Sequence, residues 1–169
     1  MYKGHNMTLC VFELLKRKDF MEEVVQEVDK FFSEKKVEEI SPSDLKSFVK
    51  LEAAIKETLR LYPQATIHPL ISLKDSQIGD FYVPKSTVCA INTTFLHRSH
   101  IFWQKPNEFL PERWLEGFQE TPLPEGVTRE MVYAPFLKGR HTCIVRKFLI
   151  IFPFFLTPKK NKGNTFGKT

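Results

Sequence analysis

The feature that most constrains the fold is an abrupt change of hydrophobic period at a proline. Up to Tyr62, apolar side chains recur at three- and four-residue spacing, which predicts helices, and Pro63 ends the pattern. From residue 66 to 92, isoleucines, valines and threonines alternate with polar residues between turn-forming dipeptides, which predicts three short antiparallel strands. The expected fold class is therefore mainly α with a small antiparallel β-sheet (α+β).

The apolar stripes upstream of Pro63 predict three helices, over residues 7–15, 19–32 and 43–62. Asp19 with Glu22 three residues later is typical of a capping box and predicts the start of the second helix. The later segments are expected to be a short helix, an extended path, an irregular segment and a loop, over residues 96–103, 107–114, 115–132 and 135–142.

Composition narrows the class of function. The net charge of +5 is spread along the chain, without the basic, aromatic-interleaved face that nucleic acid binding requires, so no nucleic acid partner is expected. Three widely spaced cysteines indicate a reducing, cytosol-facing environment rather than a disulfide scaffold. The longest apolar run, residues 148–156, is far shorter than the roughly 20 residues that a membrane-spanning helix needs.

Two charged motifs lie in different parts of the chain. Glu57 and Arg60 are three residues apart on the third predicted helix, so their side chains are neighbours. Both lie outside the face of this helix on which apolar side chains recur, and this position alone favours a solvent-exposed pair. Arg113 lies on a path fixed by Pro106 and Pro111 and could donate a bidentate fork to a carboxylate such as Glu57. A rim loop is the open alternative for that segment.

The chemical centre of the sequence is the segment from Phe136 to Ile144. Gly139 allows a tight turn and a close approach of the backbone to a bound group. Arg140 and His141 place charged or proton-donating groups just before Cys143. A thiolate at such a loop-to-helix junction can act as a metal ligand or as a nucleophile. The alternative, a small buried apolar side chain, stays open on this segment alone.

The order of the three motifs is more specific than any one of them. A helix with Glu-x-x-Arg, then Pro-Glu-Arg-aromatic, then Phe-x-x-Gly-x-x-x-Cys resembles the cytochrome P450 family over about residues 7–150. The sequences of residues 56–63, 81–85 and 97–103 are also similar to those of that family. The Gly139-Arg140-His141 variant of the loop is similar to that of sterol 14-demethylases and several fungal members.

The resemblance implies a haem cofactor. Cys143 would supply the axial thiolate of the haem iron, whose electron donation favours O–O cleavage. Phe136 would pack against the loop, and Gly139 would let the loop pass beneath the ring. His141 stands where the family usually has an arginine that contacts a haem propionate, and Arg140 is a nearby substitute. The implied cofactor-binding set is Phe136, Gly139, Arg140, His141, Cys143 and Ile144. 

The resemblance also reverses the interpretation of the charged motifs. Glu57, Arg60 and Arg113 would form a buried ionic cluster that stabilises the haem-side core, with a structural rather than a catalytic role. Removing one partner of such a cluster costs roughly 3–5 kcal/mol.

Several features depart from the family pattern. Family members are two to three times longer, and the acid-Thr pair of their central helix is expected at or before Met1. Two residues after the cysteine, Val145 replaces the glycine that is usual in the family. We expect residues 1–150 to form a partial haem domain and residues 151–169 to be a divergent, disordered tail. Such a partial domain would leave apolar surface exposed.

The expected function is that of a haem-thiolate monooxygenase fragment. It would use molecular oxygen, electrons from a reductase and a small apolar substrate such as a sterol or lipid. The parent protein would be anchored to the endoplasmic reticulum membrane, although this chain contains no anchor. The alternatives are a haem-thiolate isomerase or synthase that needs no reductase, a non-functional truncated remnant, and a zinc site formed by Cys89, His97, His100 and Cys143, which lacks paired ligand spacing.

Overall fold

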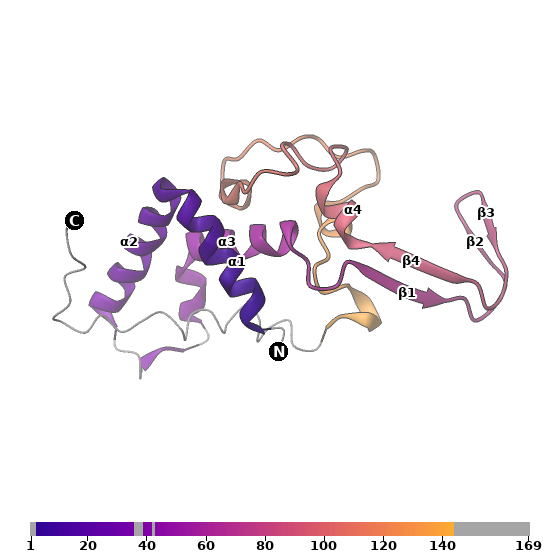
Figure 1. The fold of residues 1–169 in the computed structure, drawn as a ribbon, viewed down its shortest axis with the longest axis horizontal. Coiled ribbons are helices and arrows are strands. Elements are labelled where there is room, and N and C mark those ends of the chain that lie inside the picture. The colour runs from indigo at the N-terminus through magenta and orange to yellow at the C-terminus, as the bar shows by residue number, and fades with distance from the viewer. Residues whose placement is uncertain (1–2, 36–38, 42, 144–169) are drawn as a thin grey trace.

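The computed structural model describes residues 3–35, 39–41 and 43–143 (Figure 1). The helices are α1 (Lys3–Lys16), α2 (Lys18–Glu34), α3 (Val49–Leu61), α4 (Thr93–Arg98) and α5 (Arg129–Val132). Short 3₁₀ helices are η2 (Asp44–Ser47), η3 (Pro111–Trp114) and η4 (Gly139–His141). The strands are β1 (Ile67–Ile71), β2 (Ser76–Ile78), β3 (Phe81–Val83) and β4 (Val88–Asn92). The expected class, mainly α with a small antiparallel sheet, is confirmed.

The boundary between α1 and α2 is a single residue, Arg17. Its guanidinium group donates to both carboxylate oxygens of Asp19, at 3.1 and 2.8 Å. The predicted capping box at Asp19 and Glu22 is wrong, because α2 already begins at Lys18 and Asp19 lies within its first turn. Asp19 still lies near the positive end of the helix dipole, so its negative charge favours the start of α2.

The predicted third helix is divided in two. Phe48 is buried and has non-helical backbone angles, so η2 ends before it and α3 begins after it. Val49, expected on the apolar stripe, is 52% exposed. The N-terminus of α3 is capped from another helix, because the Glu27 carboxylate on α2 accepts from the backbone N–H groups of Lys50 and Leu51 at 2.9 and 3.0 Å. 

The β region contains four strands rather than the predicted three. β1 pairs with β4 antiparallel, from Ile67 opposite Asn92 to Ile71 opposite Val88, and β2 pairs with β3 in a separate two-stranded sheet. The hairpin between β2 and β3 turns at Gly79, whose φ of +56° is left-handed. The long hairpin is interrupted beyond Ile71, and this interruption creates the additional strand.

Three predictions for the downstream segments also differ from the structure. The helix expected over 96–103 is α4, which begins earlier because the Asn92 side chain accepts from the N–H of Phe95 at 2.9 Å and caps it. The path expected to be extended over 107–114 ends in η3, and α5 lies within the segment expected to be irregular. Ile144, Val145 and the tail from residue 151 lie outside the described residues.

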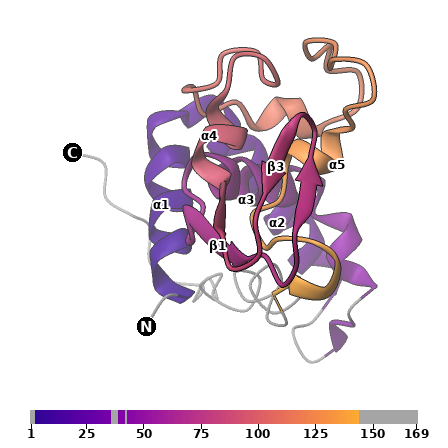
Figure 2. The same cartoon turned by 90° about the vertical axis from the view of Figure 1, so that its right-hand side faces the viewer.

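The core lies among the helices. Apolar side chains of α1, α2 and α3 form one cluster, to which Phe109 and Phe136 are added from later segments. In Figure 2, α3 lies behind the strands, at the centre of the molecule. The hairpins instead project from the helical part (Figure 1) and expose large apolar side chains: Ile67, Ile71, Leu73, Ile78, Phe81, Tyr82 and Val88. Within the described ranges, no helix combines the length and the apolar character that crossing a bilayer requires.

Replacement of Glu27 by alanine should weaken α3, because two backbone N–H groups would lose their acceptor. We expect the free energy of unfolding to fall by about 1 kcal/mol, the usual contribution of a helix cap. Urea denaturation followed by circular dichroism measures this change. Glu23→Ala on the same helix is the matched control: Glu23 pairs with the half-exposed Lys50 ammonium group, at 2.7 Å, and should matter less. Equal losses in the two variants would contradict the cap.

Candidate functional site

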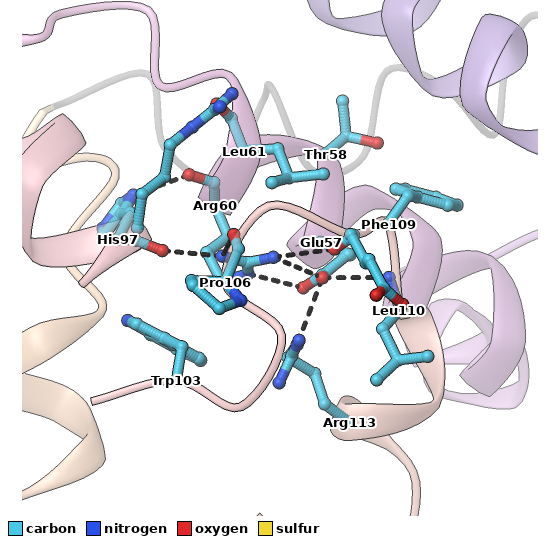
Figure 3. Close-up of polar contacts among 12 residues, drawn as sticks. Glu57, Thr58, Arg60, Leu61, His97, Trp103, Pro106, Phe109, Leu110 and Arg113 are labelled. Carbon is cyan, nitrogen blue, oxygen red and sulfur yellow. Dashed lines mark hydrogen bonds and ion pairs between the residues drawn. The ribbon is translucent and has the colours of Figure 1, made fainter. Parts of the chain in front are cut away.

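The polar centre of the molecule is the carboxylate of Glu57, which is fully buried on α3. Its oxygens accept from Arg60 Nη2 at 2.7 Å and Nε at 2.9 Å, so the two side chains form a bidentate pair (Figure 3). They also accept from Arg113 Nε at 3.1 Å, the backbone N–H of Leu110 at 3.0 Å and Trp114 Nε1 at 3.0 Å. The carboxylate therefore joins α3 to η3 and the residue before it.

Arg60 is also fully buried, and every N–H of its guanidinium group has an acceptor. Besides Glu57, it donates to the backbone carbonyl oxygens of His97 and Pro106, at 2.6 and 2.7 Å, and of Glu108, at 3.0 Å. Figure 3 shows these contacts converging on one side chain from different segments. Lysine could not replace it, because an ammonium group lacks the planar fork.

Arg113 completes the cluster that the sequence suggested. Its remaining donors bind Glu120, through a very short contact, and the carbonyl oxygen of Gln104 at 2.9 Å. The expectation of a solvent-exposed pair, which rested on the apolar stripe alone, is wrong for this helix, because η3 and the chain around Pro106 cover its polar face. Glu120 and Trp114 were not singled out from the sequence; Trp114 was visible only as the aromatic residue that ends the Pro-Glu-Arg motif.

An indole ring lies among the cationic groups. Trp103 is 1% exposed, and the guanidinium carbons of Arg60, Arg113 and Arg129 lie 5.2, 5.7 and 4.4 Å from its ring centroid. Ring faces attract cations at such distances. Burial, together with the neighbouring arginines, lowers the pKa of Arg129, although Glu120 acts in the opposite direction. 

His97 joins this cluster to the segment that leads toward Cys143. Its Nδ1 lies 3.2 Å from the carbonyl oxygen of Arg60, and its Nε2 accepts from the N–H of Ala134 at 3.0 Å. Burial, the largest cause, lowers the pKa of His97 to about 4, and the Arg60 charge contributes in the same direction. His97 is therefore neutral near pH 7. From the sequence, His97 was visible only as part of the wording shared with a known family and as a candidate zinc ligand.

Residues 136–143, here named the Cys loop, form a closed turn. The N–H of Cys143 donates to the carbonyl oxygen of Phe136 at 2.9 Å. Leu137 and Gly139 adopt left-handed backbone angles, with φ of +53° and +65°. Phe136 is buried in the core, and Cys143 is half-buried, carries a free thiol and packs against the same core. The loop thus presents a thiol at the edge of the core without burying it.

The structure describes the remaining predicted residues of the loop only in part. Arg140 is exposed, and among the described residues, chain neighbours aside, no heavy atom lies within 4 Å of the point that a Cβ of Gly139 would occupy. The backbone of His141 lies in η4. Ile144 and Val145 lie outside the described residues, so the start of a helix after Cys143 stays a prediction.

The zinc alternative gains no support. Both ring nitrogens of His97 already have hydrogen-bond partners. In the part of the chain that the structure describes, which includes Cys89, His100 and Cys143, no three potential metal ligands lie close enough together to bind one ion. 

Replacement of Glu57 by glutamine should be strongly destabilising, because the buried Arg60 would lose its counter-charge and the buried Arg113 would keep only that of Glu120. We expect a loss of roughly 3–5 kcal/mol in the free energy of unfolding, measured by urea denaturation. Glu52→Gln on the same helix is the control, since its pair with Lys56 at 2.9 Å is partly exposed on both sides and should contribute less than about 1 kcal/mol. Similar losses for both variants would contradict the electrostatic role of Glu57.

The buried neutral state of His97 predicts a specific pH dependence of stability. Its folded pKa of about 4 lies below the usual value of 6.5, so between these two pH values the unfolded chain binds a proton that the folded chain does not. The contribution of neutral His97 to the free energy of unfolding should be fully present above pH 6.5 and should be lost toward pH 4, by at most about 3 kcal/mol. Urea denaturation across this range measures the slope. In the His97→Gln variant this slope should correspond to about one bound proton fewer, whereas replacement of the exposed His100 should leave the slope unchanged.

Comparison with known proteins finds relatives that match most of the chain. The family model for cytochrome P450 matches residues 5–148. (S)-N-methylcanadine 1-hydroxylase of Papaver somniferum is 33% identical over 141 residues, which are 81% of this chain and 25% of that protein. A cytochrome P450 of Panax ginseng is 35% identical over 141 residues, 83% of this chain and 38% of that protein.

Vinorine hydroxylase of Rauvolfia serpentina is 33% identical over 131 residues, 77% of this chain and 26% of that protein. The chain therefore spans between about a quarter and two fifths of the length of these relatives. The matched region contains the Glu57 cluster, His97 and the Cys loop. On this match over most of its length, the chain belongs to the cytochrome P450 family.

Proposed function

We propose that this chain is the haem-binding portion of a haem-thiolate monooxygenase. The observation that carries the proposal is a half-buried, free thiol, Cys143, at the end of a closed loop in a member of the cytochrome P450 family. The reaction would be an oxygen-dependent hydroxylation of a small apolar substrate, with electrons from a reductase. The parent protein would face the cytosol from an anchor in the endoplasmic reticulum membrane.

The donor chemistry of the loop fits a haem. A thiolate that binds haem iron must be accessible to the haem and held in place, and Cys143 would meet both needs because it is half-buried and its N–H donates to the carbonyl oxygen of Phe136. Gly139 has no side chain, and no described residue beyond its chain neighbours occupies the place of a Cβ there, which would let a bound ring approach the backbone closely. Arg140, which is exposed, has a side chain long enough to neutralise a propionate, and His141 and Ile144 complete the proposed set.

The haem and the chain's own residues would have different roles. When bound, a haem with a thiolate ligand supplies the oxygen-activating chemistry. The chain's own residues would hold the sulfur in position and exclude water from its inner side, where Phe136 is buried. Glu57, Arg60 and Arg113 lie on α3 and η3 rather than in the Cys loop, so we assign them a structural role in the support of the haem-side core.

The names of the relatives support the reaction type more than the substrate. Two of them are named as hydroxylases, and those names refer to N-methylcanadine and vinorine. These names do not give the substrate of this chain, for which we propose a small apolar molecule. The Gly139-Arg140-His141 wording of the loop favours a sterol or lipid within that class.

Replacement of Cys143 by serine should abolish the thiolate ligation of haem. We expect the chain, reconstituted with haem and reduced under carbon monoxide, to give the strongly red-shifted absorption band of a thiolate adduct, and the variant to lack it. Cys89→Ser, which removes a half-buried thiol on β4, is the control and should retain the band. A wild-type chain without the band, or a Cys143→Ser variant that keeps it, would exclude the proposed ligand.

A further inference from the structure

We propose that His97 is a positioning residue for the Cys loop. Its imidazole, protonated on Nδ1 and unprotonated on Nε2, ties the backbone of Ala134 to the last turn of α3 and thereby fixes where the loop leaves the core. The importance of this position for haem ligation rests on the proposed function. The geometry itself does not, because it involves only contacts within the chain.

The tautomer follows from the donors and acceptors around the ring. The N–H of Ala134 can only donate, so Nε2, at 3.0 Å, must carry a lone pair. The carbonyl oxygen of Arg60 can only accept, so Nδ1, at 3.2 Å, must carry the proton. Neither nitrogen can exchange its role without leaving a buried backbone group unpaired, which is costly.

His97 is held in turn by the residue that it binds. Arg60 Nη1 donates to the backbone carbonyl oxygen of His97 at 2.6 Å, while the His97 ring binds the backbone carbonyl oxygen of Arg60 (Figure 3). The next residue, Arg98, donates to the carbonyl oxygen of Leu61 at 2.6 Å. The imidazole therefore has little freedom to move relative to α3.

From Ala134 the connection continues into the Cys loop. The carbonyl oxygen of Ala134 accepts from the N–H of Leu137 at 3.1 Å, and Leu137 is a non-glycine residue of the Cys loop in a left-handed conformation. The carbonyl oxygen of the intervening Phe136 accepts from the N–H of Cys143. Fixing Ala134 therefore constrains the turn whose closing bond is made by Cys143 itself.

A stacking contact supports the same segment. The His97 and Tyr133 rings lie 5.4 Å apart with planes 29° from parallel, and the Tyr133 hydroxyl donates to the carbonyl oxygen of Lys56 at 3.0 Å. His97 has no exposed surface. With both nitrogens engaged and no access from solvent, its ring can act on the loop through position but not through proton exchange with a substrate.

Two substitutions separate the two bonds of the ring. His97→Gln extends to the Nε2 position and retains an acceptor for the Ala134 N–H. His97→Asn reaches only the Nδ1 position, so it can still donate to Arg60 but leaves Ala134 unpaired. Both remove the ring, so each is the matched control for the other. The readout is amide hydrogen exchange of Ala134, Leu137 and Cys143 in the haem-free chain, with peptide-resolved alkylation of Cys143 and Cys89.

In His97→Asn we expect the three loop amides to exchange about tenfold faster and Cys143 to be alkylated several times faster, as loss of one buried hydrogen bond predicts. In His97→Gln these rates should stay within about twofold of wild type, and Cys89 should not change in either. Equal acceleration in both variants, or acceleration spread over α2 and α3, would overturn the positioning role.

A measurement on the wild-type chain keeps the test decisive if a variant does not fold. Nitrogen NMR of the His97 ring should show a protonated Nδ1 and an unprotonated Nε2, and the opposite tautomer would overturn the proposal. Failure of the proposed function is distinguishable: a chain that takes up no haem but shows the difference between Asn and Gln retains the positioning role. A chain with the thiolate band and no such difference loses only this inference.

Discussion

The structure depends on one buried negative charge. The Glu57 carboxylate lies where water cannot reach it, and in such surroundings an unpaired charge costs several kcal/mol. Arg60 pairs with it within α3, but the donors Arg113 and Trp114 reach it only when η3 packs against α3. The charge therefore acts less as a source of net stability than as a condition on the register of two segments more than fifty residues apart in sequence.

The same condition propagates beyond the ion pair. Once Glu57 holds the Arg60 guanidinium group, its other donors bind the carbonyl oxygens of His97, Pro106 and Glu108. An arginine can do this because its fork points in several fixed directions at once. The consequence is that α4 and the chain after Trp103 are fixed by the residue that neutralises Glu57, and the backbone that carries the Cys loop is reached from there through His97.

The sequence predicted the parts of this arrangement that are local. Helical spacing identified α1, α2 and α3, and alternation identified the strand region, since both patterns record which face of an element is apolar. The same patterns placed Glu57 and Arg60 on the surface, because an apolar stripe says nothing of a polar face that a distant segment covers. Resemblance to known sequences corrected this, as it holds information on tertiary contacts. The interruption after Ile71 and the left-handed Leu137 had no such signal, since neither requires a glycine.

The hydrogen bonds described for the backbone around the Cys loop all join residues between Lys56 and Cys143. His97, Tyr133 and the turn of Phe136 and Leu137 supply them, and none involves the exposed apolar side chains of the hairpins. Support of the sulfur is thus physically separate from the surfaces that the strands present. A substitution on those surfaces can change what the molecule contacts and leave the ligand in place, whereas a change at Arg60 or His97 must reach the loop through the backbone groups that they pair.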